Sequence, residues 1–219
     1  MTGETTSAAR DDAPTRRRSA GRRVTPERLR RILDAAAAIA TESGLAAVTM
    51  QAVAKHTGYV RPVVYDCYGT PENILLALID REGRLLSDDL GVVGGRVRTG
   101  GDLVDRLMTY VDSIFTHPGA WQLFTLPTEG VDDTVREAAD RVRDGLRQSV
   151  ARWLQPTVEK RPGPVDVEAL SIFVLAAIDG IATTVVDDSG AVDRARIRAF
   201  LESLVTAVTL TPARRRTSR

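Results

Sequence analysis

Apolar residues recur every three or four positions along most of this 219-residue chain. That spacing places them on one face of an α-helix, whereas no stretch alternates between apolar and polar residues long enough to indicate a strand. Two threonine-proline pairs, Thr25-Pro26 and Thr70-Pro71, place a capping hydroxyl before a proline at the first helical position. The pattern predicts an all-α fold.

Cap, glycine and proline signals divide the chain into helices. The expected helices run from Thr25 to Gly44, Thr49 to Gly58, Val60 to Tyr68, Thr70 to Leu86, Leu103 to Ile114, Pro118 to Leu126, Val131 to Leu154, Val165 to Val186 and Asp193 to Leu210. The stretches GVVGGRVRTGG (91–101) and PTVEKRPGP (156–164) are expected to connect helices. The first lacks the Gly-Lys-Ser/Thr ending of a phosphate-binding loop and has no strand before it, so we expect no nucleotide there.

Composition narrows the class of protein. Apolar residues make up 43% of the chain and charged residues 27%, as in ordinary globular proteins. No run reaches 18 consecutive apolar residues and no secretory signal opens the chain, so we expect no membrane span. The single cysteine, Cys67, excludes an internal disulfide and fits a reducing compartment. These features predict a cytoplasmic protein.

Charge is distributed unevenly behind a net value of +1. Residues 1–81 carry a net charge of +3, residues 82–210 a net charge of −6, and residues 211–219 four arginines and no acid. A basic front end on an acidic body suggests that one part of the chain meets a polyanion. A solvated, disordered tail over residues 1–21 is the alternative explanation for the N-terminal arginines.

The segment GYVRPVVYDCYG (58–69) is the one most informative about function. Two short helices joined by a glycine turn form the helix-turn-helix pattern, whose second helix enters the major groove of DNA. Val64 and Tyr68 are expected to pack inward, which leaves four side chains outward: Arg61, Pro62, Val63 and Tyr65. Arginine pairs with guanine, an apolar group meets a thymine methyl, and a tyrosine hydroxyl bonds phosphate. The alternative is that the valines and Tyr65 belong to the core and Arg61 is merely solvated.

The stretch RILDAAAAIATESGLAAVTMQAVAKHTGYVRPVVYDCYGTPENILLAL (31–78) resembles the DNA-binding domain of TetR-family transcriptional regulators. The matching positions are Gly44, Thr49, Val53-Ala54, Gly58, Val64-Tyr65, Tyr68 and Thr70-Pro71-Glu72. The resemblance covers about 50 residues. Beyond Arg81 only the helical layout supports it.

The resemblance implies a set of DNA-binding residues: Thr49, Val60, Arg61, Pro62, Val63, Tyr65, Asp66 and Cys67. In this set Thr49 meets phosphate, Arg61 to Val63 read bases, and Tyr65 contacts the backbone or a thymine methyl. Two phosphate ligands usual in the family are missing, because Pro71 replaces a lysine and Cys67 a histidine. Asp66 adds a negative charge that accepts from a cytosine amine or orients an arginine. We therefore expect Arg22 and Arg23 to support binding by reaching into the minor groove.

The last two expected helices, Val165–Val186 and Asp193–Leu210, resemble the family's dimerisation pair. In the first of them, the small residues Ala176, Ala177 and Gly180 allow another helix to approach closely. Core packing within one subunit explains the same apolar stripe. A twofold homodimer places two recognition helices in successive major grooves and therefore requires a palindromic operator.

The resemblance also implies an effector pocket among the middle helices. Its candidate lining residues are Tyr110, Phe115, Trp121, Phe124, Trp153, Phe173 and Asp179. Each aromatic is equally explained as core. Asp179 stands in an apolar run, where it recognises a polar ligand atom or, as we favour, pairs with an arginine.

An enzyme is disfavoured because the two histidines, His56 and His117, have no orienting group or metal-ligand spacing around them. We expect no metal and no cofactor. The predicted function is a repressor released from a palindromic operator by a small hydrophobic effector, with a helical protein-binding adaptor as the alternative. The predicted domains are an arm (1–23), a helix-turn-helix domain (24–70), an effector-binding and dimerisation domain (71–210) and a basic tail (211–219).

Overall fold

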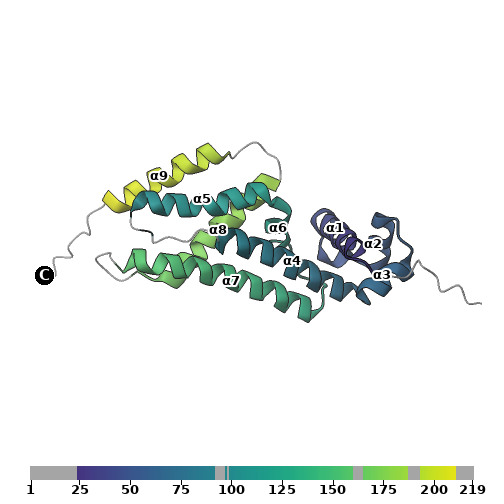
Figure 1. Cartoon of the computed structure of the whole chain (residues 1–219). Helices are drawn as coiled ribbons and strands as arrows, with labels where there is room; N and C mark the ends of the chain where they lie inside the picture. The colour runs from purple at the N-terminus through teal and green to yellow at the C-terminus, as the bar shows by residue number, and fades with distance from the viewer. Residues whose placement is uncertain (1–23, 92–96, 98, 160–164, 187–192, 211–219) are drawn as a thin grey trace, which may run out of the picture.

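The computed structural model describes residues 24–91, 97, 99–159, 165–186 and 193–210 (Figure 1). These residues form helices and no strand, which confirms the predicted all-α fold. The elements are α1 (Pro26–Ser43), the 3₁₀ turn η1 (Leu45–Ala47), α2 (Met50–Thr57), α3 (Arg61–Tyr68), α4 (Pro71–Gly91), α5 (Gly100–Thr116), α6 (Pro118–Leu123), α7 (Asp133–Val158), α8 (Val167–Val186) and α9 (Arg194–Leu210).

The helices form two lobes joined by α4. Figure 1 shows α1, α2 and α3 gathered at one end, with α4 running from them into the larger lobe. In that lobe α4 packs on α7, α7 packs on α8, and α9 lies along α5. The short helix α6 contacts α1 as well as α4, α5 and α8, so it lies between the lobes.

The first helices begin and end at the residues that the sequence signals. Thr25 Oγ1 accepts a hydrogen bond from the Arg28 amide at 3.3 Å, and Thr49 Oγ1 accepts one from the Ala52 amide at 3.1 Å. Each hydroxyl satisfies one backbone donor that the first helical turn leaves unpaired. Gly58 ends α2 in the left-handed region at φ 72°, which only glycine adopts without strain. The boundaries predicted there are confirmed.

A shared apolar core holds the small lobe together. Ile32 of α1, Val53 of α2, Val64 of α3 and Ile74 of α4 are completely buried in it. Because α2 and α3 have only eight residues each, they are marginal as isolated helices and depend on this core. Burying one such side chain contributes about 1.5–3 kcal/mol.

Polar contacts tie the small lobe to α4. Arg81 of α4 donates to Asp34 of α1 at 2.7 Å and lies 2.6 Å from the Glu82 carboxylate, which is nearly buried. The Tyr68 hydroxyl at the end of α3 donates to the Leu29 carbonyl of α1 at 3.2 Å. The orientation of α3 is therefore fixed through both α1 and α4.

The start of α5 and the end of α6 differ from the sequence prediction. Thr99 caps α5 in a capping box with Asp102, so Gly100 and Gly101 are helical rather than part of the connecting stretch. The helix α6 ends at Leu123 instead of Leu126. These shifts arise because local side-chain caps, rather than the apolar spacing, decide where the first and last turns form.

The long helix α7 also departs from its predicted limits of Val131 and Leu154. Asp132 caps it, so it begins at Asp133, and it continues through Pro156 to Val158. A proline this close to the end of a helix removes one hydrogen bond, and the Glu159 amide donates to the Gln155 carbonyl at 3.1 Å to close the last turn. The predicted connection therefore starts later, and its residues 160–164 lie outside the described part of the chain.

The helix α8 is strongly apolar, but most of it is not buried. It is long and apolar enough to cross a membrane, with a mean hydropathy of 2.1, yet only 22% of the apolar window is buried within the chain. Length and composition alone are weak grounds for a membrane span. The helix therefore carries apolar surface that its own subunit leaves uncovered.

Candidate nucleic-acid interface

The helix α3 presents one face to the core and the other to solvent. Val64 points inward and is completely buried, while Val60 is 66% exposed and Tyr65 51% exposed. Arg61, Pro62 and Asp66 are exposed as well, and Val63 and Cys67 are half-buried. The predicted outward orientation of Arg61, Pro62 and Tyr65 is confirmed, and the alternative that Tyr65 belongs to the core is wrong.

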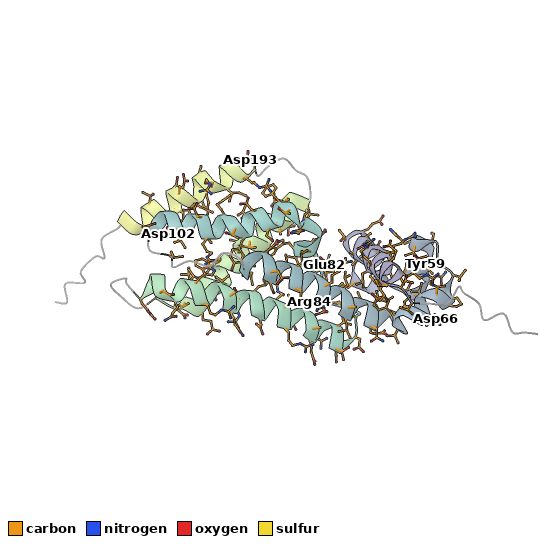
Figure 2. All side chains as sticks on the ribbon, viewed as in Figure 1. Tyr59, Asp66, Glu82, Arg84, Asp102 and Asp193 are labelled. Atoms are coloured by element: carbon orange, nitrogen blue, oxygen red, sulfur yellow. The ribbon has the colours of Figure 1, made fainter. Side chains whose placement is uncertain are left out.

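Contacts from α1 hold the turn between α2 and α3. The Arg31 guanidinium donates to the Thr57 carbonyl at 3.2 Å and lies 5.0 Å from the centre of the Tyr59 ring. The Thr57 hydroxyl donates to the Val53 carbonyl at 2.8 Å and accepts from the Tyr59 amide at 3.3 Å. Figure 2 places Tyr59 and Asp66 at the end of the molecule that α1, α2 and α3 form. The turn is thus held by α1 and by its own hydrogen bonds.

The exposed surface favours an anionic partner. No side chain caps the N-terminus of α3, and its first turn carries no acid, so the positive end of the helix dipole is uncompensated there. Lys55 and His56 are exposed in the last turn of α2. Asp66 is the one acidic residue of α3. Mixed cationic and apolar exposure of this kind suits a nucleic-acid groove better than water.

Two other predicted DNA-binding positions have defined local roles. Thr49 is exposed and already caps α2, so its hydroxyl lies at the start of that helix. Burial raises the pKa of the Cys67 thiol, which Arg28 lowers and Asp66 raises to smaller extents. A thiol is neutral when protonated and negative when ionised, so Cys67 does not supply the positive charge that a protonated histidine provides. Arg22 and Arg23 lie outside the described residues.

One contact at this surface involves a residue that the sequence prediction missed. The Arg61 Nη2 atom donates to Gln51 Oε1 of α2 at 2.7 Å, and both side chains are exposed. Nothing in the sequence signals this pair, because the two residues are ten positions apart and meet only through the angle between α2 and α3.

Three of the predicted pocket aromatics form one cluster in the large lobe. The Tyr110 ring centre lies 6.4 Å from those of Trp121 and Trp153, and Trp153 Nε1 donates to the Tyr110 hydroxyl at 3.2 Å. Trp121 Nε1 donates to Ser113 Oγ at 3.1 Å, and that hydroxyl donates to Asp89 at 2.9 Å. Phe124 is buried in the same core. The cluster is a hydrogen-bonded part of the core between α5, α6 and α7.

The remaining pocket candidates lie elsewhere. Phe115 is half-buried beneath the Arg194 guanidinium, 4.4 Å from its ring centre, and Phe173 is 73% exposed on α8. Asp179 pairs with Arg143 of α7 at 2.7 Å, and this is the arginine pairing that the sequence favoured. The Arg143 guanidinium also donates to the Phe124 carbonyl at 2.5 Å. The seven candidates therefore do not share one site.

An apolar groove of about 580 Å³ runs between α8 and α9 over α5. Its walls are almost entirely aliphatic and aromatic, and its rim carries the exposed Phe173, Phe200 and Leu204. Figure 1 shows α9 lying along α5 on the outside of the large lobe.

Several solved structures with a similar fold are transcriptional regulators. A TetR-like transcriptional regulator from Rhodococcus sp. RHA1 is 21% identical, with a TM-score of 0.68 over 87% of this chain and 100% of that one. The fatty acid degradation regulator FadR from Bacillus halodurans is 16% identical, with a TM-score of 0.66 over 84% and 96%. FadR from Bacillus subtilis, solved in complex with stearoyl-CoA, is 16% identical, with a TM-score of 0.63 over 80% and 96%.

Two family models match the sequence itself, whereas no curated protein sequence does. Residues 32–78, which include α2 and α3, match the model of bacterial regulatory proteins of the tetR family. Residues 126–210 match the model of the C-terminal part of BetI-type transcriptional repressors. The two matches together span more than half of the chain, and both agree with the fold. The chain belongs to the TetR family of transcriptional regulators, with its helix-turn-helix DNA-binding domain in the N-terminal lobe.

Proposed function

We propose that this chain is a cytoplasmic, homodimeric repressor that binds a palindromic operator and leaves it when a small hydrophobic effector binds. The main support is the outward face of α3. Arg61 and Tyr65 project from a short helix whose opposite side is anchored by the completely buried Val64. A helix held in this way can enter a major groove without losing its core contacts.

The roles on α3 follow from the chemistry of its exposed side chains. Arg61, at the first position of the helix, is the guanine reader, because its forked donors match the two acceptors of that base. Val60, Pro62 and the exposed part of Val63 supply apolar surface for thymine methyl groups. The Tyr65 hydroxyl and the exposed start of α2 at Thr49 contact phosphate and set the register.

Dimerisation is supported by the apolar surface that the large lobe leaves open. Phe173 and Phe200 are 73% and 64% exposed, and both line the groove between α8 and α9. Contiguous apolar exposure of this kind marks an interaction surface. A second copy of the chain presents the same surface about a twofold axis. In this proposal residues 71–210 form the dimerisation and effector domain, and residues 24–70 form the DNA-binding domain.

An effector of hydrophobic character is supported by one of the similar proteins. The Bacillus subtilis FadR was solved in complex with stearoyl-CoA. In this chain the Tyr110, Trp121 and Trp153 cluster lies in the core of the lobe that α4 connects to α3, so an effector that contacts these rings has to open that core. An effector acts by binding one spacing of the two α3 helices more tightly than the other.

Selection of bound sequences from random duplex DNA, with the full chain, tests the proposal. We expect one enriched motif with two inverted half-sites, and we expect Arg61→Ala to remove the preference at one position of each half-site. A helical adaptor gives no enriched motif. An enriched motif without inverted symmetry contradicts the proposed dimer on a palindromic operator but supports sequence-specific DNA binding.

Screening acyl chains and other apolar molecules against the protein–operator complex tests the proposed release of the operator by an effector. We expect one class of compound both to raise Tm and to weaken operator binding. Compounds that raise Tm but leave operator affinity unchanged contradict the coupling, whatever they bind.

A further inference from the structure

A polar contact joins the two helices of the helix-turn-helix on the exposed side. Arg61, the first residue of α3, donates from Nη2 to Gln51 Oε1, near the start of α2, at 2.7 Å. Both side chains are exposed, and ten residues separate them in sequence. The bond favours one orientation of a long side chain that has many rotamers.

This contact adds little to the packing of α2 against α3. Val53 and Val64, one from each helix, are completely buried in the same core and already bring the helices together. The turn between them is braced separately, since Arg31 bonds the Thr57 carbonyl from the side of α1. An exposed hydrogen bond beside such a core contributes little to folding, because water replaces it easily.

Arg61 has enough hydrogen-bond donors to contact a base while it is bonded to Gln51. A guanidinium has five N–H donors and no acceptor, and the bond to Gln51 uses a single nitrogen, Nη2. A bidentate contact to guanine O6 and N7 needs two donors. The amide of Gln51 is neutral, so the positive charge of Arg61 is not cancelled, as it would be by a carboxylate at the same place.

We propose that Gln51 is a positioning residue for base recognition, and that it orients the Arg61 guanidinium and thereby sets the guanine preference of the operator. The bond to Gln51 lowers the population of the other Arg61 rotamers in the free protein, which lowers the cost of forming the specific complex. Non-specific binding through phosphates does not need this orientation, so Gln51 acts on sequence preference and not on general affinity. The inference rests on the proposed DNA-binding function.

Site selection and competition binding with the wild type and four full-length variants test the proposal. The variants are Gln51→Ala, Arg61→Ala, the double variant, and Gln148→Ala, which removes the same amide from another position, on α7. We expect Gln51→Ala to lower discrimination about fivefold at the base pair where Arg61→Ala lowers it tenfold or more. The double variant should match Arg61→Ala, because Gln51 acts only through Arg61.

The controls separate positioning from folding. We expect Gln51→Ala and Gln148→Ala to keep the wild-type Tm and the wild-type affinity for random-sequence DNA. Two outcomes overturn the inference but leave the proposed function standing. One is unchanged base discrimination in Gln51→Ala. The other is a loss of discrimination in the double variant that equals the sum of the two single losses. A wild-type chain without sequence preference overturns both.

Discussion

Gly83 of α4 lies against Val142 of α7 so closely that a Cβ atom on the glycine would be 2.8 Å from Val142 Cγ2. Real Cβ atoms do not approach another carbon this closely, so the crossing of these two helices depends on the missing side chain. The contact lies in the helix that joins the DNA-binding lobe to the large lobe, which makes its geometry relevant to both.

Replacing Gly83 by alanine should lower the free energy of unfolding. Overpacking costs about 1–3 kcal/mol, whereas alanine in place of glycine in a helix returns about 1 kcal/mol. We expect a net loss of about 1 kcal/mol by urea unfolding at fixed protein concentration. Gly145→Ala is the matched control, because a Cβ at that position of α7 meets nothing within 4 Å and should raise stability. Equal stabilisation by both substitutions contradicts the crowded crossing.

A charge on the rim of the apolar groove should separate the subunits. Phe173→Glu places a carboxylate where the proposed interface excludes water, so we expect the dimer dissociation constant to rise about tenfold or more in sedimentation. Val60→Glu makes the same change at an exposed valine of the α3 N-cap and should leave the dimer intact while it weakens operator binding. Monomeric wild-type protein at micromolar concentration rules out the proposed interface.

Removal of residues 2–23 tests the basic arm. Each phosphate contact contributes about −0.9 to the slope of log affinity against log salt concentration, so loss of Arg22 and Arg23 from both subunits of the proposed dimer should reduce the slope by about 3.6. Operator affinity measured between low and moderate salt gives both slopes. An unchanged affinity and an unchanged slope show that the arm makes no contribution.

Alkaline pH should destabilise the fold through Tyr110. Burial raises the pKa of this phenol above its ordinary value near 10, and hydrogen bonds from Trp153 and with Ser149 oppose the shift. Above about pH 10 the unfolded chain loses the proton first, so the free energy of unfolding falls as the pH rises toward the folded pKa. Unfolding measured between pH 9 and 11 should show a smaller decline in Tyr110→Phe than in the wild type. A decline of equal size in both proteins assigns the effect to other groups.

The helix-turn-helix was predictable because its signals are local. Thr49 caps α2 by a bond to a residue three positions later, and Gly58 adopts the left-handed conformation that favours glycine. The positions of Val64 and Tyr68 indicate which side of the eight-residue helix α3 faces inward. Such features depend on neighbouring residues alone. They also indicated the outward direction of Arg61 and Tyr65, on which the candidate site depends.

Features made by contacts between distant helices were not predictable. The Arg61 bond to Gln51 requires the angle between α2 and α3, and the separation of Phe173 from the Tyr110 cluster requires the packing of α5, α7 and α8. Apolar spacing identifies Phe173 as part of a stripe but cannot tell a core from an uncovered interface. Pro156 was predicted to lie in a connection, and only the structure shows that the helix continues past it.

The unbroken helix α4 connects the end of α3 to the interior of the large lobe. Its 21 residues make a rod about 31 Å long, at a rise of about 1.5 Å per residue. Rotation of this rod by about 5° at one end moves the other by about 3 Å, close to the rise of one base pair, about 3.4 Å. A rearrangement of side chains inside the large lobe too small to alter its shape is therefore enough to displace α3 by about the rise of one base pair.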